Sequence, residues 1–348
     1  MKKIADSVAK RIHDFSQESP LELPAYVLEK DMHVFDAMEI VAAMPNHPYF
    51  SLVFCGGTCL SKAYGILERM SEDVDFKVVP KGMALTLVRA ARRTQLRVFG
   101  KSVADALVNG GFMGEDAVKR TSNDEGACTT INVKYESAFE KPESLRAHLL
   151  IEMNYANLID PIQTKDVGLL LDRLENGSYL KTLQLACVSL EEALAEKMVS
   201  FPRRLGKHMS DQMPDGDTRA TTYDDKFLKE ALHWDKSLVR HLYDVNILLE
   251  RHPALLSNVN EFGRLLAAVI KKDAVDFKNK HVDYIANPIK ALQSALVFAK
   301  GSRALRAQYD KFVIDMVYAP AKPTYDEAVE SFEAALNTVL FSPPAALS

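Results

Sequence analysis

The 348-residue chain lacks most features that mark a secreted or membrane protein. Its four cysteines, Cys55, Cys59, Cys128 and Cys187, are too few and too scattered for a disulfide framework, and no CxxC pair predicts a zinc site. No apolar run approaches the roughly 20 residues that span a bilayer. Residues 1–6 become charged before the apolar core of a signal peptide can form. We therefore expect a cytoplasmic protein without a membrane segment.

The composition also lacks any bias toward disorder or toward a polyanionic partner. The net charge is −4, and 47% of the residues are hydrophobic and 26% charged, as in ordinary folded proteins. A local basic patch remains compatible with nucleic-acid binding. The length favours two domains. No GxxxxGK[ST] motif, no GxGxxG after a strand and no HExxH motif occurs, so P-loop, dinucleotide-binding and zinc-protease chemistry are not indicated.

Hydrophobic periodicity predicts a mixed α/β (α+β) domain in the first half of the chain. The expected helices are 28–41, 58–67 and a basic helix at 85–99, and the expected strands are 51–55, 73–79, 129–135 and 147–155. From residue 189 onward nearly every segment has helical periodicity. We therefore expect domains at 1–188 and 189–348, the second helical with a loop insertion at 205–236, where apolar residues are few.

One short segment carries groups suited to phosphate chemistry. Gly56 and Gly57 lie between a predicted strand and helix, where the backbone can approach a phosphate closely, and the Thr58 hydroxyl can donate to it. Lys62 follows one turn later and supplies a cation. On its own, however, a Gly-Gly pair usually marks nothing more than a turn.

Three carboxylates complete the pattern. Asp73 and Asp75 alternate across Val74, so on a strand both point to one face and can share metal ions about 3.5–4 Å apart. Glu152 is an acid in an otherwise apolar predicted strand. All-oxygen ligands suit Mg²⁺, with Mn²⁺ as a substitute. A lone DxD is common on surfaces, and Glu152 alone is compatible with an edge-strand charge. The order of strand, glycine turn, helix and acidic strand favours the metal site.

These segments closely resemble the nucleotidyltransferase family of AbiEii/AbiGii-type toxins. The resemblance rests on residues 54–62 (FCGGTCLSK), 68–76 (ERMSEDVDF), 28–31 (LEKD), 192–198 (EALAEKM) and 240–245 (RHLYDV). It implies a polymerase-β-like nucleotidyltransferase core followed by a helical domain. Gly56, Gly57 and Thr58 would then hold the triphosphate, and Asp73 and Asp75 the metal.

The same resemblance implies two further site residues. Lys197 and Asp244 would complete the active site, facing its cleft, and their replacement would then change stability little. Ser71 joins Lys62 among the predicted nucleotide-binding residues. Read without the family, Lys197 is an ordinary lysine of an amphipathic helix, and Asp244 an intrahelical partner of Arg240. His241 stands where the family has aspartate, which leaves nucleotide choice and acceptor geometry open.

The sequence thus predicts a Mg²⁺-dependent enzyme that transfers a nucleoside monophosphate from an NTP. By resemblance, its acceptor would be RNA, particularly tRNA, and it would act as the toxin of a toxin–antitoxin or abortive-infection system with a winged-helix antitoxin. Two alternatives stay open: a nucleotidyltransferase that modifies a metabolite or antibiotic, and a protein that binds NTP without turnover.

Overall fold

The structure, a computed structural model, describes residues 1–19, 21, 23–140, 146–211, 235, 237–277 and 281–341. The chain divides into two compact units. The first comprises Met1–Ser189 with Tyr318–Pro320, and the second comprises Leu190–Val317 with Ala321–Ser348. Among the described residues, no helix is both long enough and apolar enough to cross a membrane.

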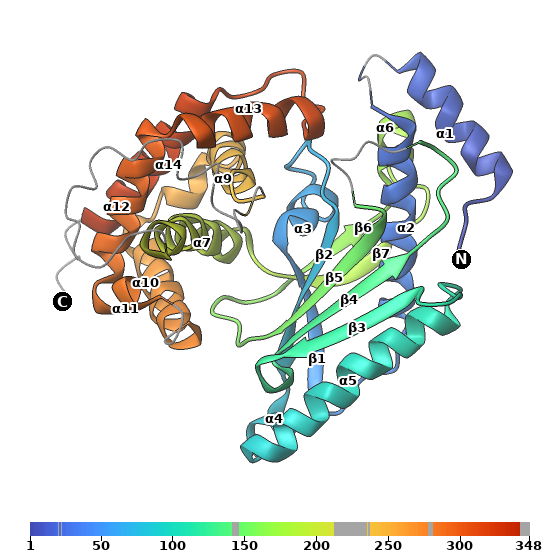
Figure 1. Cartoon of the computed structure of the whole chain (residues 1–348), viewed down its shortest axis with the longest axis horizontal. Helices are drawn as coiled ribbons and strands as arrows, with labels where there is room; N and C mark the ends of the chain where they lie inside the picture. Colours follow the sequence, from blue (N-terminus) through green and yellow to red (C-terminus); the bar gives the residue numbers. More distant parts are fainter. Residues whose placement is uncertain are drawn as a thin grey trace. The chain divides into compact units, whose positions relative to one another are not determined.

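A mixed seven-stranded sheet forms the centre of the first unit, in the order β3-β4-β5-β2-β1-β7-β6 (Figure 1). Its strands are β1 (Phe50–Cys55), β2 (Asp73–Pro80), β3 (Val118–Asn123), β4 (Cys128–Lys134), β5 (His148–Tyr155), β6 (Gln163–Val167) and β7 (Leu183–Cys187). The pairs β1–β7 and β2–β5 are parallel, and the other neighbours are antiparallel. Because β1 and β2 run in opposite directions, the end of β1 lies beside the start of β2.

The core of this unit lies between one face of the sheet and two long helices, α2 (Ala25–Ala42) and α5 (Arg89–Asn109). The sheet contributes Phe54, Phe76 and Ile151, each at most 3% exposed. The helices contribute Val34, Phe35, Met38, Leu96, Phe99 and Val103. The remaining helices of the unit are α1 (Asp6–Glu18), α3 (Gly56–Lys62), α4 (Gly82–Leu85), the short 3₁₀ turn η1 (Asp124–Gly126) and α6 (Leu170–Asn176).

The other face of the sheet carries polar side chains where β2 and β5 are neighbours. Successive residues of a strand point to opposite faces. Val74 is therefore fully buried in the core, while Asp73 and Asp75 on either side of it are half-buried. In β5, Glu152 is half-buried in the same way between two buried apolar residues. The strand pattern thus separates an apolar face for folding from a polar face for chemistry.

The described residues of the second unit form helices and their connections. The helices are α7 (Leu190–Asp211), α9 (Arg240–Arg251), α10 (Val259–Asp276), α11 (Val282–Ala286), α12 (Pro288–Gly301), α13 (Arg303–Met316) and α14 (Tyr325–Phe341), with the 3₁₀ turn η2 (Pro253–Leu256). A mixed-sheet unit and a helical unit confirm the predicted fold class. The loop insertion expected at 205–236 starts inside α7, which continues to Asp211; residues 212–234 and 236 lie outside the described residues.

Most predicted elements of the first unit are present, but the helix after the glycine turn is shorter than expected. It was predicted at 58–67, whereas α3 spans Gly56–Lys62. Gly65 adopts a left-handed backbone with φ of 66° shortly after the helix ends. Glycine in this conformation is a common helix terminator, and it overrides the helical periodicity that continues to Leu67. All four cysteines are free thiols.

His33 of α2 is a fully buried histidine, and its burial predicts that folding is sensitive to acid. Its ring stacks on Tyr135 with centroids 4.1 Å apart, and neither ring nitrogen has a hydrogen-bond partner among the described residues. Burial, with a smaller repulsion from Lys2, lowers the pKa of His33 to about 4. The unfolded chain therefore binds a proton that the folded protein excludes between about pH 6.5 and pH 4.

We expect the free energy of unfolding to fall by about 3 kcal/mol as the pH is lowered from about 6.5 to 4, because only the unfolded chain protonates His33 in this range. Urea denaturation at pH 7 and pH 4.5 measures most of this loss. The variant His33→Leu should reduce it, whereas His13→Leu, at an exposed position of α1, should leave it unchanged. An equal loss of stability in all three proteins would show that other groups cause the acid sensitivity.

Candidate functional site

The predicted catalytic residues of the first unit meet at one end of the sheet. Strand β1 ends at Cys55, whose antiparallel partner in β2 is Asp75. In the parallel pair β2–β5, Asp75 lies opposite Glu152. Directly opposed residues of neighbouring strands have their side chains on the same face. The glycine turn that follows β1 therefore lies beside Asp75, and Glu152 lies beside Asp75 on the other side.

The approach of Gly56 to Asp75 is so close that only glycine fits. Gly56 has a φ of 77°, and a Cβ atom added there would lie 2.0 Å from Oδ2 of Asp75. A side chain would be strained by this backbone conformation and would also collide with the carboxylate. Gly56 thus holds the turn directly against the acidic strand, where a phosphate bound to its backbone would meet a metal bound to Asp75.

A side chain is excluded at Gly57 as well, but by a different neighbour. A Cβ atom at Gly57 would lie 2.4 Å from a terminal nitrogen of Arg69. The Arg69 side chain is buried and donates a hydrogen bond to the Met70 carbonyl at 2.9 Å. A guanidinium group therefore lies directly against the turn. The sequence does not single out Arg69, although it stands inside the second motif, because one arginine between a helix and a strand has no diagnostic pattern.

Thr58 and Ser71 connect α3 to the start of β2. The Thr58 hydroxyl lies 2.8 Å from Oγ of Ser71 and donates to the backbone carbonyl of Asp73. Thr58 is 1% exposed, so these contacts lie within the protein. They hold the helix after the glycine turn next to the first carboxylate. Binding of a phosphate by Thr58 or Ser71 stays a prediction.

Lys62 contacts groups on two other elements. Its Nζ forms a 2.6 Å ion pair with Asp31 of α2 and donates to the Gly168 carbonyl at 3.2 Å. Asp31 also accepts a hydrogen bond from the backbone of Leu170, at the start of α6. Lys62 is 6% exposed and joins α3 to these elements. Its predicted role as a cation for the nucleotide is not needed to explain its position, and stays a prediction.

Asp73 is bound by Arg146, which no sequence motif indicates. The Arg146 guanidinium donates to Oδ1 of Asp73 in an ion pair. Arg146 lies 73 positions along the chain from Asp73, just before β5. Behind this pair, Lys30 and Glu72 form a buried ion pair of 2.8 Å. Burial lowers the pKa of Lys30, and the attraction of Glu72 opposes that shift.

The three carboxylates offer the donor atoms that a hard divalent cation prefers. Asp73, Asp75 and Glu152 are all oxygen ligands, carried on neighbouring strands at the same end of the sheet. In the part of the chain that the structure describes, no group of three His, Cys, Asp or Glu side chains is already arranged as metal ligands. Asp73 instead contacts Arg146. The residues fit Mg²⁺ in chemistry and strand position, provided that Asp73 changes partner.

Lys197 and Asp244, the site residues predicted in the second unit, contact each other. Nζ of Lys197 in α7 donates to Oδ2 of Asp244 in α9 at 2.7 Å. Lys197 is 7% exposed and Asp244 is 1% exposed. They therefore form a buried ion pair that joins two helices. The expectation that their loss would leave stability unchanged needs revision, because an unpaired buried charge is costly.

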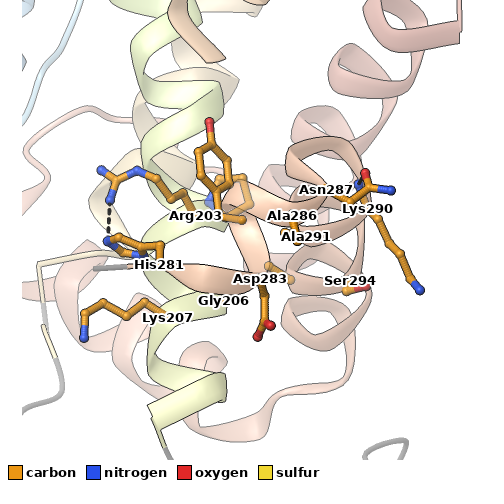
Figure 2. A pocket seen from close by; sticks show the side chains of 13 residues that line it. Arg203, Gly206, Lys207, His281, Asp283, Ala286, Asn287, Lys290, Ala291 and Ser294 are labelled. Atoms are coloured by element: carbon orange, nitrogen blue, oxygen red, sulfur yellow. Dashed lines mark hydrogen bonds between the residues drawn. The ribbon is translucent and has the colours of Figure 1, made fainter. Parts of the chain in front are cut away.

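The second unit also contains a cavity of about 390 Å³ beside α7, lined in part by α11 and the first turns of α12 (Figure 2). Arg203 and His281 are among the residues that line it.

Arg203 donates to Nε2 of His281 at 3.1 Å, and its guanidinium stacks over Phe277 at 4.0 Å. It also pairs with Asp273. Arg203 is 6% exposed, and the Asp273 carboxylate compensates its charge. Its position is thus explained by contacts within the helical unit.

A comparison with protein families identifies the class of this protein. Residues 40–336 match the family described as "Nucleotidyl transferase AbiEii toxin, Type IV TA system". Because the match covers most of the chain, the chain belongs to this family. It is a nucleotidyltransferase toxin of a type IV toxin–antitoxin system, which confirms the resemblance noted in the sequence motifs.

Among solved structures, the chain is similar to MenT4, a nucleotidyltransferase toxin from Mycobacterium tuberculosis H37Rv. The two are 17% identical, with a TM-score of 0.47, and the similarity covers 95% of this chain and 98% of that one. A search of curated proteins finds no significant match.

Proposed function

We propose that the protein transfers a nucleoside monophosphate from an NTP to RNA, with tRNA as the acceptor class, in a Mg²⁺- or Mn²⁺-dependent reaction that releases pyrophosphate. The observation that carries this proposal is the contact between the Gly56 turn and Asp75, with Glu152 opposite Asp75 on the next strand. A phosphate cradle and a set of carboxylates are the two parts that nucleotidyl transfer needs.

The chemistry follows from these positions. A hydroxyl oxygen of the acceptor forms a bond to the α-phosphorus while the bond from that phosphorus to its bridging oxygen breaks, so pyrophosphate leaves. Asp75 or Glu152 accepts the hydroxyl proton. A bound Mg²⁺ supplies charge neutralisation at the phosphates. The Gly56-Gly57 backbone, which lies against Asp75, orients the triphosphate for this in-line attack.

The basic helix α5 supports an RNA acceptor. Arg89, Arg93 and Arg97 lie on its exposed surface. Arg89 is paired with Glu125 at 2.8 Å. Exposed arginines at successive turns of one helix suit the phosphate backbone of a nucleic acid. The net charge of the whole chain does not oppose this, because local patches govern such contacts.

The proposed biological setting is the cytoplasm, with a winged-helix antitoxin that restrains the toxin. Four free thiols suit a reducing compartment. Induced expression should arrest bacterial growth, and co-expression of the neighbouring antitoxin gene should relieve the arrest.

The acceptor is tested by incubating the purified protein with each of four α-³²P-labelled NTPs, Mg²⁺ and a tRNA pool. We expect labelled RNA of tRNA size from at least one NTP, and no label when EDTA replaces Mg²⁺. Metal-dependent pyrophosphate release without labelled RNA would favour a small-molecule acceptor. Nucleotide binding without any pyrophosphate release would favour a binding protein and contradict the proposal.

A further inference from the structure

Arg146 is held in place by the buried ion pair behind the acidic site. Its backbone N–H donates to Oε1 of Glu72 at 3.0 Å, and its carbonyl accepts from Nζ of Lys30 at 3.0 Å. The Lys30 and Glu72 side chains are only 2% and 3% exposed and lie 2.8 Å apart. Both polar groups of the Arg146 backbone are therefore fixed. Buried ion pairs are costly to build, and this one positions an arginine directly before β5.

The side chain of Arg146 is less restricted than its backbone. It is 38% exposed, and the only partner of its guanidinium that the described residues show is the Asp73 carboxylate. Asp73 is itself tied down on its backbone side, where its carbonyl accepts from Thr58. The structure thus places a solvent-accessible cation, on a fixed backbone, against one of the carboxylates that we assign to the metal.

This position has opposite consequences for a metal ion and for a nucleotide. A guanidinium group on Asp73 competes with a cation for the same carboxylate and repels it. The same group attracts a phosphate, which it can bind with two parallel hydrogen bonds. A divalent cation that arrives with a triphosphate would remove the conflict if Arg146 moved from Asp73 to a phosphate oxygen.

We propose that Arg146 couples metal binding to nucleotide binding by changing partner from Asp73 to the NTP phosphates. This inference rests on the proposed function and adds a role to it. Arg146 weakens binding of the metal alone and strengthens binding of the metal–nucleotide complex. Because such coupling is reciprocal, each ligand raises the affinity of the other. The protein then holds a metal at Asp73 chiefly when a nucleotide is present.

Calorimetry with Mn²⁺ and a non-hydrolysable NTP analogue tests this role without any need for turnover. In the variant Arg146→Gln, we expect Mn²⁺ alone to bind several-fold more tightly than in the wild type. The analogue in the presence of Mn²⁺ should bind about ten- to a hundred-fold more weakly, the size of a lost charge-assisted hydrogen bond. Arg146→Lys keeps the charge without the planar fork and should restore part of the coupling.

Arg306→Gln is the matched control, because Arg306 is an exposed arginine of α13 that is ion-paired with Asp326. It should leave both affinities unchanged, and thermal melting should show that all variants are folded. Weaker binding of Mn²⁺ alone by Arg146→Gln would mean that Arg146 only orients Asp73, and would overturn the inference. Equal coupling between Mn²⁺ and the analogue in the wild type and in Arg146→Gln would also overturn the inference. If the wild type binds no analogue with Mn²⁺, the proposed function fails, and this inference with it.

Discussion

Replacing Asp75 by asparagine should reduce nucleotidyl transfer by about three orders of magnitude or more while leaving the protein folded. Asp75 lies between the Gly56 turn and Glu152, so it is the carboxylate nearest to all parts of the proposed reaction. Asparagine has nearly the same shape, but it carries no charge and cannot accept the acceptor's proton. Incorporation of label from an NTP into RNA measures the rate, and thermal melting measures stability.

The control is the same substitution at an exposed aspartate of the same unit. Asp105 of α5 pairs with Lys101 at 2.6 Å on the surface, and Asp105→Asn should keep full activity. Asp75→Asn should also lose the extra thermal stabilisation that Mg²⁺ and an NTP together give the wild type. An Asp75→Asn protein with more than a tenth of wild-type activity would contradict the assignment of the site.

The acidic end of the sheet was predictable because its parts are local in sequence. Gly56, Asp73 and Asp75 lie within 20 residues of one another, and a strand, a turn and a returning strand bring them together without any knowledge of distant contacts. Glu152 was predicted from its isolated charge in an apolar strand, and the register places it opposite Asp75. Alternation of buried and half-buried residues in β5 and at the start of β2 shows which face of the sheet carries these acids.

Other parts could not be predicted, for physical reasons. Arg146 reaches Asp73 through a contact between segments far apart in the chain, and an arginine before a strand carries no periodic signal. Strand β3 has the sequence VKRTSN, which lacks an apolar run because it is an edge strand with one neighbour. The burial of Lys197 and Asp244 was missed because charged residues usually lie on the surface, unless a partner from another helix compensates them.

The burial of Lys197 and Asp244 leads to the second large effect that we expect. Each single change, Lys197→Met or Asp244→Leu, removes one charge of the buried pair and keeps the other, and should lower the unfolding free energy by about 3–5 kcal/mol. The double variant replaces both charges with apolar side chains and should recover most of that loss. If the pair also serves catalysis, all three variants should lose about two orders of magnitude in transfer rate.

The double variant therefore separates a structural role of the pair from a catalytic one. If the pair serves catalysis, this variant should regain stability but not activity. Denaturant unfolding and label incorporation, both measured where each protein is folded, make the comparison. The control is Arg306→Met, which breaks an exposed ion pair with Asp326 in the same unit and should cost less than about 1 kcal/mol. Should the double variant regain both stability and activity, Lys197 and Asp244 are a structural pair, and the proposed catalytic residues are confined to the first unit. Should it regain stability alone, the buried charge is retained for the reaction, since the fold does not need it.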